Sequence, residues 1–273
     1  MSKMHVTRAA LVLLSMLLLT NCTTVTVLPA APKAVVAELV PSGTLRAAIN
    51  FGNPILATRD PVTGAPSGVS VDMARELGRR LGVPVELVTF MAAGKVAEGA
   101  LTNAWDVAFV AIDPVRGVDM EQTPAYVIIE GAYLVPAASP ITANAQIDRA
   151  GIQVVVAQGS AYDLYLTREL KQARLVRVPT SPDVVDAMVA QRLDASAGVR
   201  QIMQSEAKRV PGVRVLDGRF MVINQAMATP KGRLAGARYL EAFVEEMKAS
   251  GFVAVALARH RIEGAAVAPP ATR

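Results

Sequence analysis

The chain has 273 residues, of which 52% are hydrophobic and 19% charged, and its formal net charge is +5. A chain of this length and apolar content can bury a sizeable core, and its composition excludes an extended disordered polymer. The basic residues form no run interleaved with aromatic residues, so nothing in the composition indicates nucleic-acid binding.

Residues 1–21 have the pattern of a secretory signal peptide. Lys3 and Arg8 supply its cations, and residues 9–19 form an apolar run too short for the roughly 20 residues that span a bilayer. Removal of this leader would lower the net charge to +3. Cys22, the only cysteine, follows in a setting that resembles a bacterial lipobox, which implies lipidation. Asn21 replaces the small residue usual before that cysteine, so an ordinary signal peptide is the alternative. Residues 22–41, rich in Thr, Ala, Pro and Val, are predicted to be a tether.

From Ser42 onward, strand and helix patterns alternate, which is typical of an α/β fold. In the first half we expect strands at 44–49, 85–88 and 107–111, and helices at 71–81 and 96–101. The strand at 107–111 is apolar without alternation, as parallel strands covered on both faces are. It begins after Asp106 and is followed by Arg116, so it places a cation where open α/β sheets bind ligands.

The second half repeats this plan. Strands are predicted at 152–157, 175–178 and 194–197, and helices at 161–171, 183–191 and 234–249. Residues 100–108 and 188–196 share a helix end, a turn, an aspartate and a buried strand, which indicates two small α/β units. Residues 136–140 are a predicted crossing between the units and residues 220–226 a predicted return. Residues 265–273, rich in Ala and Pro, are expected to be disordered.

Five motifs carry a resemblance to a known family: Ser42-Gly43-Thr44-Leu45-Arg46, Gly68-Val69-Ser70-Val71-Asp72-Met73-Ala74, Trp105-Asp106-Val107-Ala108 with Arg116 after it, Thr123-Pro124-Ala125-Tyr126, and Val156-Ala157-Gln158-Gly159-Ser160. By their order and spacing, the chain resembles family 3 extracellular solute-binding proteins, the polar amino-acid receptors of ABC importers. The resemblance covers about residues 42–262.

This resemblance implies a type II periplasmic-binding-protein fold, in which two α/β lobes joined by two hinge strands close on a ligand. The first lobe would comprise residues 42–134 and 222–264, and the second residues 135–221. The resemblance also implies a monomer in the periplasm or on the outer face of the membrane, an ABC permease as partner, and no metal or organic cofactor.

The resemblance assigns binding roles to several residues. Arg116 matches the arginine that holds the ligand carboxylate, for which its planar guanidinium offers two parallel hydrogen bonds. Ser160 and the Ala161 N–H open a helix, whose N-terminus attracts anions. Phe51 would be an aromatic wall and Asn53 a polar contact.

The alternatives are structural. Arg116 would then be a solvated arginine after a turn, Ser160 a plain helix cap with Asp163, and Phe51 an aromatic residue that caps the core. Gln225, on the return strand, is a further candidate to line the cleft.

One departure from the family concerns the ligand's α-ammonium group. The acid that pairs with it in the family falls about at Gly198 here, and Arg200 adds a positive charge nearby. A buried ammonium without a partner costs several kcal/mol. Either the ligand lacks an α-amino group or Asp113 supplies the counter-charge. We therefore expect a small carboxylate-bearing solute, either an amino acid or a related organic acid.

Enzyme functions find little support in the residue types. After the leader the chain has one histidine, His260, which excludes histidine-based triads and Cys/His zinc clusters. Secreted cyclohexadienyl dehydratases, which act on prephenate or arogenate, resemble this fold and need a carboxylic acid in the cleft as general acid. Asp113 is the only candidate for that role. A ligand-sensing module that acts in trans is a third possibility.

Overall fold

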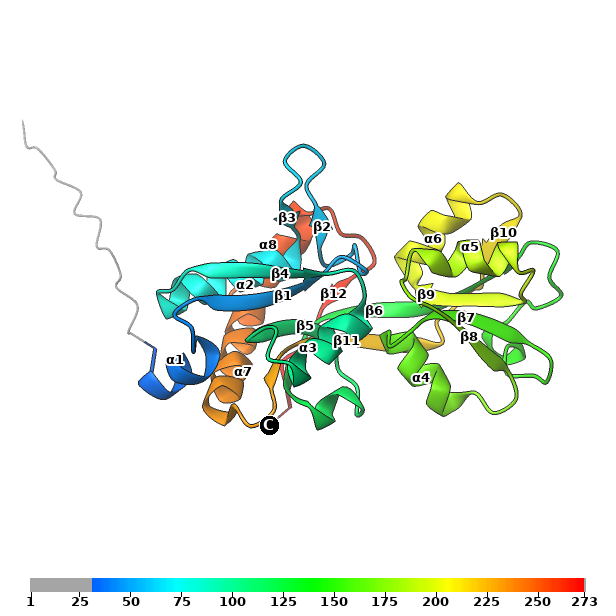
Figure 1. The fold of residues 1–273 in the computed structure, drawn as a ribbon. Coiled ribbons are helices and arrows are strands. Elements are labelled where there is room, and N and C mark those ends of the chain that lie inside the picture. The colour runs from blue at the N-terminus through cyan, green and yellow to red at the C-terminus, as the bar shows by residue number, and fades with distance from the viewer. Residues whose placement is uncertain (1–30, 273) are drawn as a thin grey trace, which may run out of the picture.

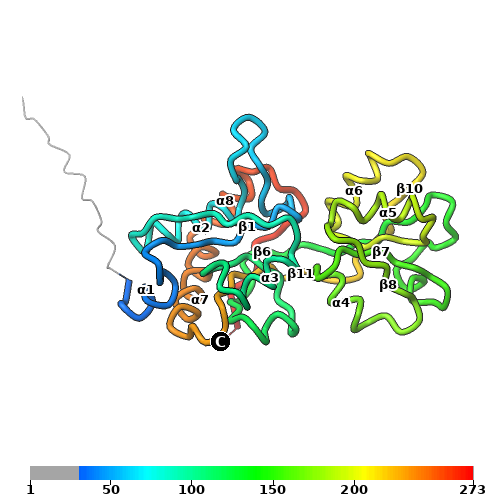
Figure 2. Tube along the Cα trace, viewed as in Figure 1, coloured from blue at the N-terminus to red at the C-terminus, as the bar shows by residue number. Residues whose placement is uncertain are grey.

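The computed structural model describes residues 31–272, which form two lobes beside each other (Figures 1 and 2). The described helices are α1 (Lys33–Leu39), α2 (Val69–Leu81), α3 (Ala93–Leu101), α4 (Ala161–Glu169), α5 (Asp183–Ala190), α6 (Arg200–Arg209), α7 (Leu234–Ala249) and α8 (Phe252–Arg259), with 3-10 turns η1 (Arg116–Val118) and η2 (Asn144–Gln146). The described strands are β1 (Leu45–Asn50), β2 (Thr58–Arg59), β3 (Pro66–Ser67), β4 (Val85–Phe90), β5 (Val107–Ala111), β6 (Met120–Pro136), β7 (Gln153–Ala157), β8 (Arg174–Val178), β9 (Ala195–Val199), β10 (Val213–Val215), β11 (Met221–Pro230) and β12 (Ala266–Val267).

One sheet runs through both lobes in the order β4-β1-β5-β11-β6-β9-β7-β8. In the first lobe β1 pairs in parallel with β4 and β5, and in the second β7 pairs in parallel with β8 and β9. The antiparallel strands β6 and β11 pass between the lobes, as Figure 1 shows. The predicted α/β class, with two lobes joined by two strands, is confirmed.

The buried apolar side chains of the described residues form a first core and a smaller cluster around Trp105 in the first lobe, and a second core in the second lobe; Ala161 and Val199 of the second lobe join the first core. Along β6 the first core ends at Ile129 and the second begins at Tyr133, which places residues 133 and 134 in the second lobe. The crossing predicted at residues 136–140 lies too late, because Pro136 already pairs with Val213 of the second lobe. The 17-residue strand β6 makes the crossing instead. Its backbone groups pair with β11 in the first lobe and with β9 in the second, so the strand continues through the boundary between the lobes.

Local patterns explain the elements that matched. Strand β5 and helix α7 have the predicted ends. Helix α2 ends at Gly82, whose φ of 69° is a left-handed conformation that favours glycine. Helices α6 and α8 and the β2–β3 hairpin were not expected.

The predicted tether contains a packed helix and is wrong in its described part. Val35 and Leu39 of α1 lie one helical turn apart and are buried in the first core. Glu38 accepts a hydrogen bond at 2.7 Å from the backbone N–H of Gly236, in the first turn of α7. The predicted signal peptide and Cys22 lie outside the described residues.

The expectation of a disordered tail is also wrong. Ala266 and Val267 form β12, which pairs antiparallel with Ile128 and Val127 of β6. Ala268 is buried, and Lys248 donates a hydrogen bond at 2.8 Å to the carbonyl of Pro269. Without the tail, backbone N–H and C=O groups at this edge of β6 would lack a strand partner, and β12 supplies their hydrogen bonds.

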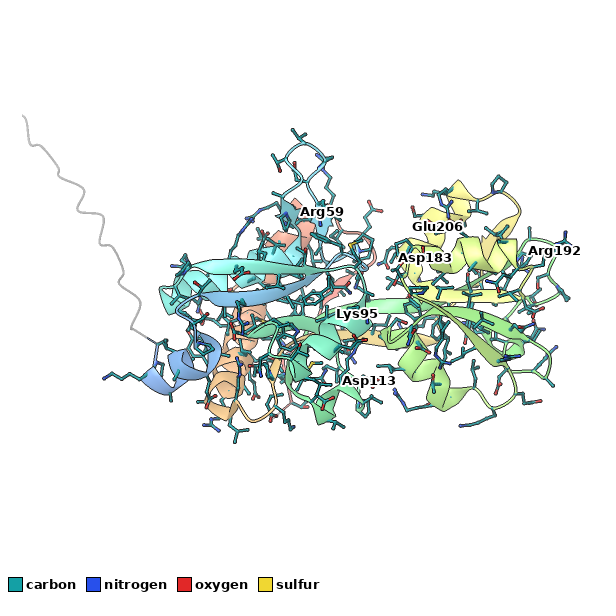
Figure 3. The ribbon with its side chains drawn as sticks, in the orientation of Figure 1. Arg59, Lys95, Asp113, Asp183, Arg192 and Glu206 are labelled. Carbon is teal, nitrogen blue, oxygen red and sulfur yellow. The ribbon has the colours of Figure 1, made fainter. Side chains whose placement is uncertain are left out.

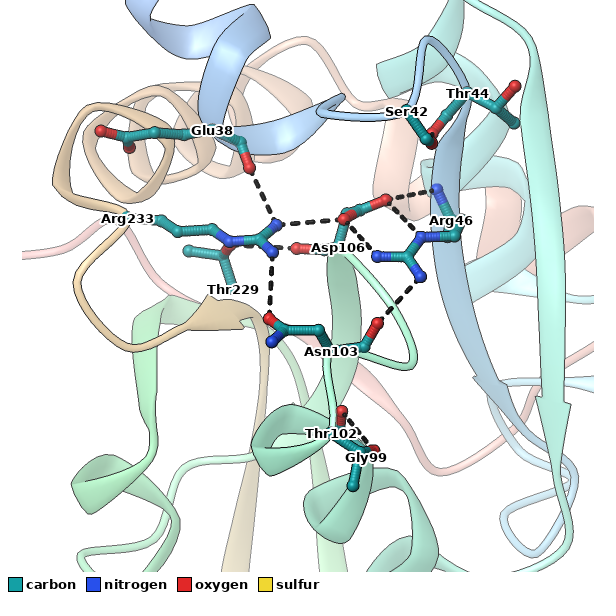
Figure 4. Close-up of polar contacts among 10 residues, drawn as sticks. All are labelled: Glu38, Ser42, Thr44, Arg46, Gly99, Thr102, Asn103, Asp106, Thr229 and Arg233. Atoms are coloured by element: carbon teal, nitrogen blue, oxygen red, sulfur yellow. Dashed lines mark hydrogen bonds and ion pairs between the residues drawn. The ribbon is translucent and has the colours of Figure 1, made fainter.

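A buried carboxylate anchors the first lobe at the amino ends of its parallel strands. Asp106 is fully buried and accepts hydrogen bonds from the guanidinium of Arg46 at 2.9 and 3.0 Å and from Arg233 at 3.1 Å (Figure 4). Arg233 also donates to the carbonyl of Glu38 in α1. Asp106 therefore connects β1, β5, α1 and the start of α7, at the end of the strands away from Arg116.

Candidate functional site

A cleft lies where the carboxyl ends of parallel strands from both lobes face each other. Its cavity volume is about 50 Å³. Its described walls are formed by Asn50, Gly52, Asn53, Leu56, Ser70, Ala93, Phe109, Val110, Ala111, Arg116, Ser160, Ala161, Tyr162, Ser181, Val199, Ile223 and Gln225. The structure thus brings together five residues predicted for the site, namely Arg116, Ser160, Ala161, Asn53 and Gln225.

Arg116 is the only charged side chain among the described residues of these walls. It follows β5, is 4% exposed, and donates to the carbonyls of Ala111 at 3.1 Å and of Gly159 in the second lobe at 2.8 Å. Its Nε is buried and has no partner among the described residues. Burial lowers the pKa of the Arg116 guanidinium to about 10, and the charge of Asp113 opposes this shift. At neutral pH the cleft therefore holds a desolvated cation with a free donor.

The second lobe presents a helix N-terminus to this cation. Ser160 is 4% exposed and caps α4, with its Oγ accepting from the N–H of Asp163 at 3.1 Å. Ala161 is the first residue of α4 and also lines the cleft. The cap predicted as an alternative is present, and Ser160 faces the cleft as well. The partial positive charge of the helix end adds to that of Arg116.

The aromatic residues of the cleft wall are Phe109 and Tyr162 rather than the predicted Phe51. Phe51 is absent from the walls, and its ring packs below the guanidinium of Arg59 at 4.4 Å, against the first core. Phe109, in the middle of β5, lies edge-to-face with Tyr126 at 5.9 Å. Ile223 of β11 is a second apolar wall residue that was not predicted. Each lies on a strand whose side chains alternate between faces, but the pattern alone does not say which face is the cleft.

The two neutral amide side chains predicted for the site, those of Asn53 and Gln225, come from the first lobe and the crossing strand. Asn53 lies in the turn after β1, and its Oδ1 is buried without a partner among the described residues. Gln225 of β11 is 5% exposed and borders the same space. Both amides offer donors and acceptors without charge.

Asp113, predicted to line the cleft, pairs with a residue of the other lobe instead. Its carboxylate is 4% exposed and accepts from Arg168 of α4 at 2.8 and 3.3 Å. Figure 3 shows Asp113 on the side of the first lobe that faces the second. Asp113 is neutralised by Arg168 and does not line the cleft, so it is not the counter-charge for a ligand ammonium group there.

The structure shows the surroundings of residues 198–200, where the resemblance expects the family's acid. A Cβ at Gly198 would meet the Met203 side chain at 2.6 Å, so this position faces the core of the second lobe. The next residue, Val199, ends β9 and lines the cleft. Arg200 is held away by Glu130, at 2.8 Å. The residue at the end of β9 that lines the cleft is therefore apolar.

Metal ligands do not gather in the described chain. Within residues 31–272, no three His, Cys, Asp or Glu side chains lie close enough together to hold an ion. Among the helices of the same residues, none combines the length and the apolar character of a membrane span.

Comparisons with known proteins agree with this architecture. The family model of bacterial extracellular solute-binding proteins, family 3, matches residues 45–260. No curated protein matches the chain.

Solved structures share the fold at low sequence identity. A solute receptor for L-cysteine of Neisseria gonorrhoeae is 21% identical with a TM-score of 0.72, and 85% of this chain and 94% of that chain align. A mutant of ArgBP from T. maritima is 21% identical with a TM-score of 0.71, over 84% and 100%. An ancestral amino acid-binding protein, a precursor of cyclohexadienyl dehydratase, is 20% identical with a TM-score of 0.68, over 82% and 97%. With its type II periplasmic-binding-protein fold and a family match across both lobes, the chain belongs to the family 3 bacterial extracellular solute-binding proteins.

Proposed function

We propose that this protein is the extracytoplasmic receptor of an ABC importer and binds a small carboxylate-bearing solute between its lobes. The observation that carries the proposal is Arg116, a buried cation between the lobes whose Nε has no partner among the described residues. A desolvated charge is costly unless it is paired, and a carboxylate would supply both the charge and the acceptor.

Contacts between the lobes support binding by closure. Arg116 donates across the cleft to the carbonyl of Gly159, and Asp113 pairs across it with Arg168. Gly94 and Gly159 approach so closely that a Cβ at Gly159 would lie 2.9 Å from the Gly94 Cα. These contacts exist only when the lobes are together, so a ligand that binds Arg116 and the α4 N-terminus at once favours the closed form.

The cellular setting follows from family membership and the N-terminal pattern. Family members are extracellular or periplasmic solute receptors, and the leader at residues 1–21 supports the same location. A lipid at Cys22 would hold the receptor at the membrane beside its permease. Relatives of known structure are described as binding L-cysteine or L-arginine, so amino acids belong among the carboxylates to test.

The dehydratase alternative lacks its general acid. The described walls of the cleft contain no Asp or Glu side chain, and Asp113 is paired with Arg168. The neighbour related to those enzymes is itself described as an amino acid-binding protein.

Native mass spectrometry of the purified protein tests the proposal. We expect a co-purifying carboxylate that dissociates on mild activation, and a rise in Tm when the identified compound is added back. Turnover of prephenate, or a bound solute without an anionic group, would contradict the proposal.

A further inference from the structure

We propose that the solute is a small monocarboxylate whose remaining groups are uncharged, as in a 2-hydroxy acid, and not a zwitterionic amino acid. This inference rests on the proposed function and concerns the same cleft. It follows from the charge balance, the direction of the wall residues and the neutral polar groups inside.

The charge balance of the cleft allows one anionic group. Arg116 is the only charged side chain among the described wall residues, and the α4 N-terminus adds further positive potential. One carboxylate neutralises this site. An α-ammonium group would bring a second cation into a region that already attracts anions, with no acid on the described walls to pair it.

Three acids on elements around the cleft are already engaged by arginines, and Glu98 and Asp119 border an adjoining groove rather than the cleft itself. Asp163 of α4 accepts from Arg177 at 2.9 Å and from the Gly159 N–H at 2.8 Å. Glu206 of α6 borders a neighbouring groove and accepts from Arg209 at 2.9 Å. The Asp113–Arg168 pair has been described above. A ligand ammonium would have to displace an arginine from one of these carboxylates, and loss of that partner is costly for the buried carboxylates of Asp113 and Asp163.

Val199, at the end of β9, lines the same cleft as Arg116 and comes from the opposite lobe. Val199 is 5% exposed and lines the cleft, whereas its neighbour Gly198 faces Met203. An apolar side chain there cannot compensate a positive charge. It tolerates a hydroxyl or a carbonyl at much lower cost, because neither is ionised.

Neutral polar groups are available for such a substituent. The Asn53 Oδ1 is buried without a partner among the described residues, and the Gln225 amide borders the same space. A ligand hydroxyl can donate to one amide oxygen without adding charge. Phe109 and Ile223 add apolar walls, and a cavity of about 50 Å³ favours a short carbon skeleton.

Matched ligand pairs test the inference on the purified protein. Isothermal titration calorimetry is done with glycolate and glycine, L-lactate and L-alanine, and D-glycerate and D-serine, each pair differing in hydroxyl against ammonium. We expect at least one hydroxy acid to bind about 100-fold or more tightly than its amino counterpart, because the ammonium is left unpaired.

A variant of the wall supplies a second readout. Val199→Asp places a carboxylate at the end of β9, and we expect it to shift the preference toward the amino acid of each pair by about ten-fold or more. Val199→Asn is the matched control, because asparagine has nearly the shape of aspartate but no charge. We expect this variant to keep the preference for the hydroxy acid.

The outcomes separate the two proposals. Amino acids that bind the unmodified protein as tightly as their hydroxy counterparts overturn the inference and leave the carboxylate receptor intact. If no member of any pair binds, and native mass spectrometry shows no bound carboxylate, both proposals fail.

Discussion

Arg116→Met separates a ligand-binding arginine from a structural one. Methionine keeps an apolar stem of similar length and removes the charge. In the unliganded protein the buried cation is a cost, because its pKa falls from 12.5 to about 10, and each pKa unit corresponds to about 1.4 kcal/mol. Loss of the charge would therefore stabilise the fold by about 3 kcal/mol if nothing else changed.

Two hydrogen bonds offset part of this gain. The substitution removes the donors to the carbonyls of Ala111 and Gly159, at about 1 kcal/mol each. The Ala111 carbonyl keeps a bond from Gln122 at 3.2 Å, so it stays satisfied. The net expectation is that Arg116→Met is more stable than the unmodified protein by about 1 kcal/mol, and no longer gains Tm from a carboxylate.

Urea unfolding without ligand and thermal shift with ligand measure the two effects. Arg168→Met is the matched control, because it removes another arginine of the same region but leaves Asp113 buried and unpaired, and should destabilise the protein. A loss of about 2 kcal/mol or more in Arg116→Met would show that Arg116 is a structural residue. An unchanged ligand-induced shift would remove it from the site.

Three further outcomes are expected. Asp106→Asn weakens the ion pairs that join β1, β5 and α7, and should lower the free energy of unfolding by about 3 kcal/mol in urea titrations, with ligand affinity in the folded protein unchanged. Arg168→Ala removes a closing contact that does not line the cleft, and should weaken ligand binding about ten-fold in calorimetry while small-angle scattering shows a larger radius of gyration; equal affinity would argue against a role in closure. Because the pKa of Arg116 is about 10 without ligand and a bound anion raises it, affinity should be constant from about pH 6 to 9 and fall as the pH rises through 10; a loss already complete below pH 8 would point to another group.

Local patterns in the sequence predicted the lobes and the place of the cation. The apolar run of β5 between Asp106 and Arg116 predicted a buried strand with an arginine at its carboxyl end, and both are present. Ser160 with Asp163 three residues later predicts a helix cap, and Ser160 caps α4. These features depend on residues close together in the chain, so periodicity and capping rules reach them.

Some errors concerned which face of an element is buried. The resemblance places the family's acid about at Gly198, whereas Val199 lines the cleft, and a shift of one residue on a strand reverses the side. The same uncertainty put Phe51 on the wall in place of Phe109. Strand alternation shows that two faces exist, and the packing of neighbouring elements decides which of them lines a cleft.

The sequence by itself determined the α/β class, the two lobes and a single arginine at the end of a buried strand, because short-range patterns encode them. Only the tertiary structure decided that Asp113 belongs to Arg168 and that the chain end pairs with β6. Those contacts join residues tens of positions apart, and whether a charge is neutralised or left free depends on which partner the fold brings within a few ångströms. In this cleft that geometry leaves Arg116 with a free donor and no acid beside it on the described walls.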